Sequence, residues 1–195
     1  MGKILIATLL TASLSSVFAS HQFFARIDVY GSAKKIELQA VPDGKMSNID
    51  WGDKSTRKYS ITGTSAALSQ GEWTKISFSF IPQNTGCVLI DLMSAWKKTK
   101  GKKHIDEVWI YFDAISAEGT EIKNGDFSVR ENGFPTNWNC AKSQYTTEGL
   151  EFYSGDAAVK VWHNKRCSQT IKVTGEQKVT ISAYVRPAEY IESKE

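Results

Sequence analysis

The segment EIKNGDFSVRENGFPTNW, residues 121–138, is typical of the start of a β-rich domain, yet it lies past the middle of a 195-residue chain. Two Asn-Gly pairs and one Pro-Thr pair separate single apolar residues, namely Phe127, Phe134 and Trp138. Asn, Gly and Pro favour tight turns, so this pattern indicates short extended pieces joined by turns. The segment predicts that a β domain begins here, but the chain that follows is too short to complete such a domain.

The rest of the chain shows the alternation of apolar and polar residues that is typical of β-strands. In TKISFSFIP, residues 74–82, the side chains of Ile76, Phe78 and Phe80 share one face. Similar segments, separated by turn residues, are 23–31, 34–41, 57–63, 86–96, 106–116, 150–155, 157–163, 168–175 and 177–187. About ten short strands without a helical repeat predict one all-β domain, an antiparallel sandwich or barrel.

The first 19 residues are predicted to be a secretory signal peptide. Lys3 gives a positive start, residues 4–19 form an apolar run, and Val17 and Ala19 are the small residues expected before a cleavage site. A transmembrane anchor is the alternative, but the run is short and serines interrupt it. We therefore expect a secreted or extracytoplasmic chain with a single domain over residues 20–195.

Charge and hydropathy exclude some partners. The formal charge of +3 falls by one when Lys3 is removed, which is too little for the basic face that nucleic acids require. The basic run KKTKGKKH, residues 97–104, is interpreted as a solvated loop. No other segment is apolar enough to span a membrane in the mature chain. We also expect the protein to be a monomer.

Three cysteines are consistent with one disulfide and one free thiol. Cys87 lies in the apolar run CVLIDL and is predicted to be a buried, reduced residue. Cys140 and Cys167 lie beside polar turn sequences, so they are the favoured disulfide pair in an exported chain.

Five motifs after residue 123 resemble, in order, the first half of jelly-roll carbohydrate-binding modules of the galactose-binding-like superfamily. They are the NGDF strand, a Pro-x-x-Trp element, a Ser-Gly turn, a Gln-x-Ile-x-Val strand and a strand that ends near Arg186. Upstream, GEWTKISFSF, TGCVLIDLMSAW and VWIYFDAISAEG resemble the second half of the same modules. The resemblance implies a jelly-roll β-sandwich that binds carbohydrate.

The two halves stand in reversed order, and two arrangements explain this. In a circular permutant, the usual start at Asn124 is joined to the usual end at Ala117, with the junction near residues 117–124. Alternatively, the chain holds pieces of two tandem modules, each of them incomplete. The permutant is favoured, because two half-sandwiches would each expose an unpaired sheet edge and lack a closed core.

No familiar catalytic pattern occurs. None of the three histidines lies in a recognisable triad, and no nucleophile elbow, zinc or phosphate-loop motif is present. Asp91 and Asp113 both lie on predicted strands and could converge as the carboxylate pair of a glycosidase. A calcium ligand or a polar surface residue is the favoured interpretation of each, so we expect a non-catalytic protein.

The aromatic residues point to sugar binding, since rings cover the apolar faces of sugars and polar side chains reach their hydroxyls. Trp109 and Tyr111 lie opposite the core-facing residues of their strand, so they are predicted to line a cleft or to be exposed unless a loop covers them. Further candidates for the same cleft are Arg26, Asp28, Tyr30, Tyr184 and Arg186. By the resemblance, Trp73 and Trp138 are assigned to the core instead.

Loop tryptophans form a competing candidate site. Trp51 lies in the turn sequence NIDWGDKS, Trp96 precedes the lysine run, and Trp162 follows a strand. Packing over a sheet edge is the alternative for each of these rings.

The resemblance also implies a structural calcium ion between the NGDF strand and the closing strand. Asp126 and Asp113 match its acidic positions, but Ser128 replaces the acidic residue expected after Phe127. We therefore expect a non-catalytic carbohydrate-binding module. A jelly-roll glycan hydrolase or lyase is the first alternative, and a cell-surface adhesion or protein-binding module is the second.

Overall fold

The computed structural model describes residues 23–31, 36–41, 49–50, 59–64 and 68–193. The strands are β1 (Ala25–Gly31), β2 (Leu38–Val41), β3 (Ile49–Asp50), β4 (Ser60–Thr64), β5 (Thr74–Pro82), β6 (Gly86–Ser94), β7 (Glu107–Glu118), β8 (Arg130–Glu131), β9 (Phe134–Pro135), β10 (Tyr145–Thr146), β11 (Ala158–Val161), β12 (Cys167–Val173) and β13 (Val179–Ile191). A short 3-10 helix, η2, covers Lys142–Gln144. The described residues contain no helix long and apolar enough to cross a membrane.

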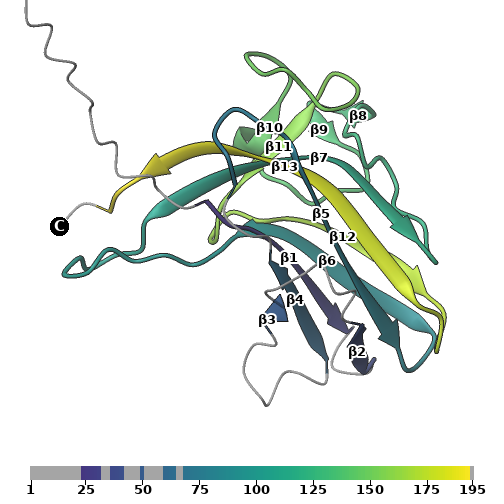
Figure 1. The fold of residues 1–195 in the computed structure, drawn as a ribbon. Helices are drawn as coiled ribbons and strands as arrows, with labels where there is room; N and C mark the ends of the chain where they lie inside the picture. The colour runs from purple at the N-terminus through teal and green to yellow at the C-terminus, as the bar shows by residue number, and fades with distance from the viewer. Residues whose placement is uncertain (1–22, 32–35, 42–48, 51–58, 65–67, 194–195) are drawn as a thin grey trace, which may run out of the picture.

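The fold is an all-β antiparallel sandwich of two main sheets (Figure 1). One sheet has the order β12-β6-β1-β4-β3, and the other has the order β10-β11-β7-β13-β5-β2. Both sheets combine strands from before and after residue 119: β12 pairs with β6 in the first sheet, and β13 lies between β7 and β5 in the second. The two halves of the sequence therefore share one sandwich. Whether this order is a circular permutation of a known fold stays a prediction.

One hydrophobic core lies between the two sheets. Its largest fully buried side chains include Phe78, Phe80, Phe112 and Phe127, which come from both halves of the chain. The alternating pattern of β5 and β13 places every second residue in this core, because successive side chains of a strand point to opposite faces. The core therefore explains the period-two pattern in the sequence.

Strand β7 switches the side that faces the core partway along its length. Val108, Ile110 and Phe112 are buried in the core, but beyond them Ile115 takes that position. The register with β13 shifts at this point, and Ala114 has a φ of 49°. A β-bulge inserts one extra residue and so reverses the alternation. Before the bulge, Trp109 and Tyr111 face away from the core, as predicted.

The segment 121–138 is folded around Asn124. The Asn124 side chain donates to the carbonyl oxygens of Val129 (2.8 Å) and Thr136 (2.9 Å) and accepts a hydrogen bond from the Val129 N–H (2.9 Å). The Asn132-Gly133 pair joins β8 to β9 with positive φ at both residues, as the predicted tight turn requires. This framework directs Phe127 and Trp138 into the core, where their ring centroids are 5.2 Å apart.

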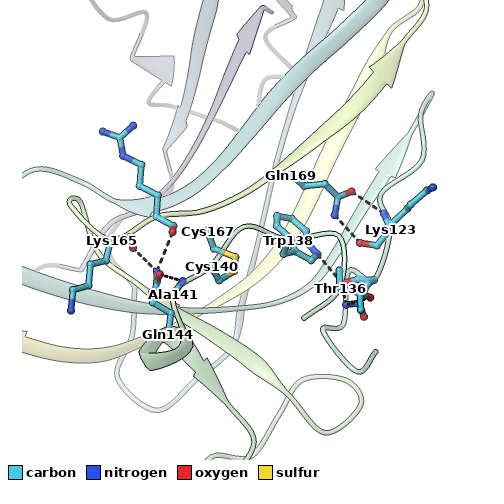
Figure 2. The surroundings of a disulfide bond; sticks show 11 residues. Lys123, Thr136, Trp138, Cys140, Ala141, Gln144, Lys165, Cys167 and Gln169 are labelled. Atoms are coloured by element: carbon cyan, nitrogen blue, oxygen red, sulfur yellow. Dashed lines mark hydrogen bonds between the residues drawn. A yellow bond between two sulfur atoms is a disulfide. The ribbon is translucent and has the colours of Figure 1, made fainter. Parts of the chain in front are cut away.

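A disulfide between Cys140 and Cys167, the favoured pair, ties this segment to the start of β12 (Figure 2). The two Cα atoms are 4.6 Å apart. Next to it, the amide of Gln144 donates to the carbonyl oxygen of Lys165 (2.8 Å). Cys87 is free but only half-buried, so the prediction of a buried residue was wrong. It lies on the outward side of β6, because Val88 and Ile90 take the core positions.

Candidate functional site

The outer face of the six-stranded sheet carries four of the predicted binding residues, Trp109, Tyr111, Tyr184 and Arg186. The register places Lys160 of β11 opposite Tyr111 of β7, and Tyr111 opposite Arg186 of β13. Trp73 immediately precedes Thr74, whose partner on β13 is Val185, so it continues this row across the sheet. The row alternates cationic and aromatic side chains, all of them half-buried. Adjacent strands lie about 4.8 Å apart, so the row spans roughly 14 Å.

A second layer of rings lies over the same face. Tyr153 is 45% exposed, and its ring is stacked on Tyr184 with centroids 3.4 Å apart. Trp73 meets Tyr153 edge to face at 6.4 Å, and the Trp73 indole N–H donates to the carbonyl oxygen of Glu151 (2.9 Å). Arg186 donates to the same oxygen at 3.5 Å. We call Trp73, Tyr111, Tyr153, Tyr184 and Arg186 the aromatic face.

Sequence reasoning missed two members of the aromatic face. Trp73 was assigned to the core by resemblance, but it is half-buried at the outer surface, so that assignment was wrong. It stands before the first residue of β5, where it packs on a loop instead of between the sheets. Tyr153 lies in the loop before β11, so the prediction of a strand over 150–155 was wrong. Alternation within this segment therefore could not indicate the direction of the Tyr153 ring.

Trp109 faces outward next to this row but is covered. Its ring is only 7% exposed and lies 6.0 Å from the ring of Trp162. The ammonium groups of Lys160 and Lys165 lie 4.9 and 5.5 Å from the Trp109 ring. The Trp109 indole N–H donates to Glu107 (2.9 Å). In this structure the ring supports the lysines above it and presents little surface for stacking.

The structure does not bring all the predicted residues together. Arg26, Asp28 and Tyr30 lie on β1, on the outer face of the five-stranded sheet, whereas Tyr111 and Tyr184 lie on the other sheet. The prediction of one shared cleft was therefore wrong. Alternation shows which residues share a face of a strand, but it does not show which sheet the strand joins.

The residues on β1 form a network of ion pairs. Arg26 donates to both oxygens of Asp28 (2.7 and 2.8 Å), and the Tyr30 hydroxyl donates to the same carboxylate (2.7 Å). Asp91 lies opposite Asp28 on β6 and accepts a hydrogen bond from Arg166 (3.1 Å). Burial raises the pKa of Asp91, while Arg166 opposes the shift. Burial and the Asp28 carboxylate also raise the pKa of Tyr30. We call Arg26, Asp28, Tyr30, Asp91 and Arg166 the charged cluster.

The loop tryptophans differ in their surroundings. Trp51 lies outside the described residues. Trp96 is 56% exposed, whereas Trp162 is 8% exposed and packs beside Trp109. Among the described side chains, the buried Trp162 indole N–H and His163 Nδ1 lack a hydrogen-bond partner. Only Trp96 is therefore an exposed loop tryptophan in the described structure.

The two carboxylates considered for catalysis lie apart. Asp91 belongs to β6 in the five-stranded sheet and is a member of the charged cluster. Asp113 belongs to β7 in the six-stranded sheet and accepts a hydrogen bond from the N–H of Ser154, in the loop before β11. A glycosidase needs both carboxylates to flank one glycosidic bond. The geometry does not pair Asp91 with Asp113 for that chemistry.

The two carboxylates of the predicted calcium site accept hydrogen bonds from protein groups. Asp113 accepts hydrogen bonds from the Ala114 N–H (2.6 Å) and from the Ser154 N–H (2.9 Å) and hydroxyl (3.1 Å). Asp126 accepts from the N–H (3.2 Å) and hydroxyl (3.0 Å) of Ser128. Calcium needs six to eight oxygen ligands, and within the described chain no group of three acidic, His or Cys side chains could hold a metal ion. The calcium prediction is left to experiment.

Comparison with known proteins found no matching family model, no similar curated protein and no similar solved structure. The candidate site therefore stands on the geometry of this chain. The resemblance to galactose-binding-like modules stays a prediction.

Proposed function

We propose that the protein is a non-catalytic carbohydrate-binding module and that the aromatic face is its binding site. The observation that carries the proposal is the row Lys160, Tyr111, Arg186 and Trp73 across the six-stranded sheet, with Tyr153 exposed beside it. Rings of this kind cover the apolar faces of sugar units, and the cationic groups between them address hydroxyl or carboxylate groups.

Energetic reasoning assigns most of the selectivity to the rings. Hydrogen bonds to sugar hydroxyls contribute little net free energy, because water competes for the same groups. A ring that stacks on the sugar removes apolar surface from water and excludes water from the neighbouring polar contacts. Tyr111 and Tyr153 are the most direct candidates for stacking, whereas Trp109 is covered.

Export and family membership are parts of the same proposal. The Cys140–Cys167 disulfide supports an oxidising compartment, as the predicted signal peptide requires. The antiparallel sandwich is compatible with a circularly permuted galactose-binding-like jelly roll. The separation of Asp91 from Asp113 weighs against the alternative of a glycan hydrolase that uses this pair.

Affinity electrophoresis through gels that contain neutral or acidic polysaccharides tests the proposal. We expect Tyr111→Ala and Tyr153→Ala each to weaken retention about tenfold, which corresponds to about 1.4 kcal/mol. Phe134→Ala is the matched control, since this exposed ring lies on β9 outside the aromatic face. Retention of both tyrosine variants at the parent level would remove the aromatic face as the site. A parent protein that no polysaccharide retains would contradict the proposed function.

A further inference from the structure

The connection between β6 and β7 is a hydrogen-bonded loop that contains the basic run. We call residues 95–106 the Trp96 loop; it projects beyond the ends of the two sheets (Figure 1). The Lys102 N–H donates to the Thr99 carbonyl oxygen (3.1 Å), and Gly101 has a φ of 88°. These two features define a type II turn with Lys100 at its tip. The lysines are therefore held at a defined turn.

A buried carboxylate fixes the base of this loop. Asp106 is 1% exposed and accepts hydrogen bonds from Thr99 (2.7 Å), Tyr190 (2.8 Å) and the Ser193 N–H (3.0 Å). The Asp106 N–H donates to the carbonyl oxygen of Lys97 (2.9 Å). Because these contacts join the loop to β13 and the residues after it, the loop has a defined conformation at its base.

An exposed ring and an apolar pocket lie beside the lysines. Trp96 is the most exposed large aromatic side chain of the described residues. It borders a pocket of about 230 Å³ lined by Phe24, Ala95, Trp96, Lys97 and Val108. Five lysines stand within residues 97–104, and Lys98, Lys100 and Lys103 are exposed. The loop therefore combines one apolar surface with a local concentration of positive charge.

We propose that the Trp96 loop is a second binding site, which takes an acidic polysaccharide. Trp96 covers a sugar ring at the mouth of the pocket, and the exposed lysines pair with carboxylate or sulfate groups of neighbouring units. The choice of a sugar polymer rests on the proposed function. The choice of an acidic one rests on the exposed Lys98, Lys100 and Lys103, which lie in a segment, 97–105, whose sequence contains no acidic residue.

Other anionic partners fit the loop less well. Insertion into a membrane surface needs several apolar side chains, but Trp96 is the one large apolar residue that the described loop exposes. Nucleic acid requires a basic face larger than one turn, and the formal charge of the chain is only +3. A short acidic polymer matches both the size of the loop and its charge.

The test compares the retention of the parent with that of two loop variants in gels containing polygalacturonate, dextran sulfate or neutral dextran. The variants are Trp96→Ala and the triple change Lys98→Gln, Lys100→Gln, Lys103→Gln. A second triple change, Lys142→Gln, Lys172→Gln, Lys178→Gln, is the matched control, because it removes the same charge from exposed positions elsewhere. Circular dichroism checks that each variant is folded.

We expect both loop variants to weaken retention on at least one acidic polymer about tenfold, with the control triple close to the parent. Retention should fall between about 50 mM and about 500 mM salt, since screening weakens exposed charge pairs. Equal loss in the two triple variants, or full retention by Trp96→Ala, would overturn the proposal. Binding to anionic vesicles or duplex DNA that exceeds binding to both acidic polymers would also overturn it.

These outcomes separate this inference from the proposed function. If neutral dextran or another neutral polymer retains the parent through Tyr111 while the acidic polymers do not, the aromatic face stands and the Trp96 loop site fails. If the loop variants lose retention on an acidic polymer while Tyr111→Ala and Tyr153→Ala keep parent retention on every polymer tested, the loop site stands and the aromatic face fails.

Discussion

The two outer faces of the sandwich differ in how much aromatic surface they leave exposed. On the five-stranded sheet, Arg26, Asp28 and Tyr30 bond one another, and Arg166 bonds Asp91. On the six-stranded sheet, half-buried rings and cations stand in a row, Lys160 pairs with Glu189 (3.0 Å), and Tyr153 is 45% exposed. A cluster whose charges are satisfied internally contributes to stability, whereas exposed rings have surface left for a partner. The difference predicts that substitutions on the two faces affect different measurements.

The largest expected effect is on the charged cluster. Asp28→Ala leaves Arg26 and the Tyr30 hydroxyl without their shared acceptor, and Asp28 is 2% exposed. Removing one partner of a buried ion pair costs about 3 kcal/mol of unfolding free energy. We expect this loss in urea unfolding, with retention on polysaccharide unchanged once the variant is folded. Normal stability together with lost retention would assign binding to the five-stranded sheet instead.

The next prediction separates the two neighbouring rings of β7. Trp109→Ala should lower the unfolding free energy by about 2–3 kcal/mol, because the ring is covered by Trp162 and two lysines. Tyr111→Ala should cost less than about 1 kcal/mol, because its ring is half-buried on the outer face. Retention should fall in Tyr111→Ala more than in Trp109→Phe, which keeps a ring in place.

A double substitution of Trp109 and Tyr111 would mix these effects, so the single variants are needed. Binding lost in Trp109→Phe but kept in Tyr111→Ala would contradict the assignment of the aromatic face. Comparable unfolding free energies for the two alanine variants would show that the Trp109 ring is not packed as described.

A smaller effect distinguishes the two carboxylates within the charged cluster. Because burial raises the pKa of Asp91, the folded chain holds this proton to higher pH than the unfolded chain does, whose Asp pKa is about 3.9. The free energy of unfolding therefore falls as the pH rises from the unfolded-state pKa of Asp91 to its raised folded-state pKa, and it falls no further above that. Asp91→Asn lacks this loss, so its stability relative to the parent should increase as the pH rises above about 4.

Urea unfolding of both proteins across this pH range measures the difference. Asp28→Asn is the matched control, and it should be destabilised because Asp28 accepts three hydrogen bonds from Arg26 and Tyr30. A relative stability of Asp91→Asn that decreases as the pH rises would contradict the assigned direction of the shift.

The sequence predicts the strands well because alternation directly reflects burial on one side of a sheet. It also indicates the β8–β9 turn through Asn132-Gly133 and the pairing of Cys140 with Cys167. It does not place β1 and β7 on different sheets, since strand neighbours depend on contacts distant in sequence. Tyr153 was missed for a related reason. The orientation of its ring depends on stacking against Tyr184, which is distant in sequence, and not on a local alternation of residues.

The smallest effect is expected from calcium. A cation between Asp113 and Asp126 would have to displace the donors that Ala114, Ser154 and Ser128 already supply. We therefore expect the melting temperature in about 1 mM calcium to differ from that in excess chelator by less than about 1 °C, because a ligand stabilises a fold appreciably only when its free concentration exceeds its dissociation constant for the folded state. Asp113→Ala should lower stability equally in both conditions, since it removes the acceptor for the Ser154 N–H and hydroxyl. A calcium-dependent rise in the parent that Asp113→Ala abolishes would restore the calcium site and imply that these donors rearrange around the ion.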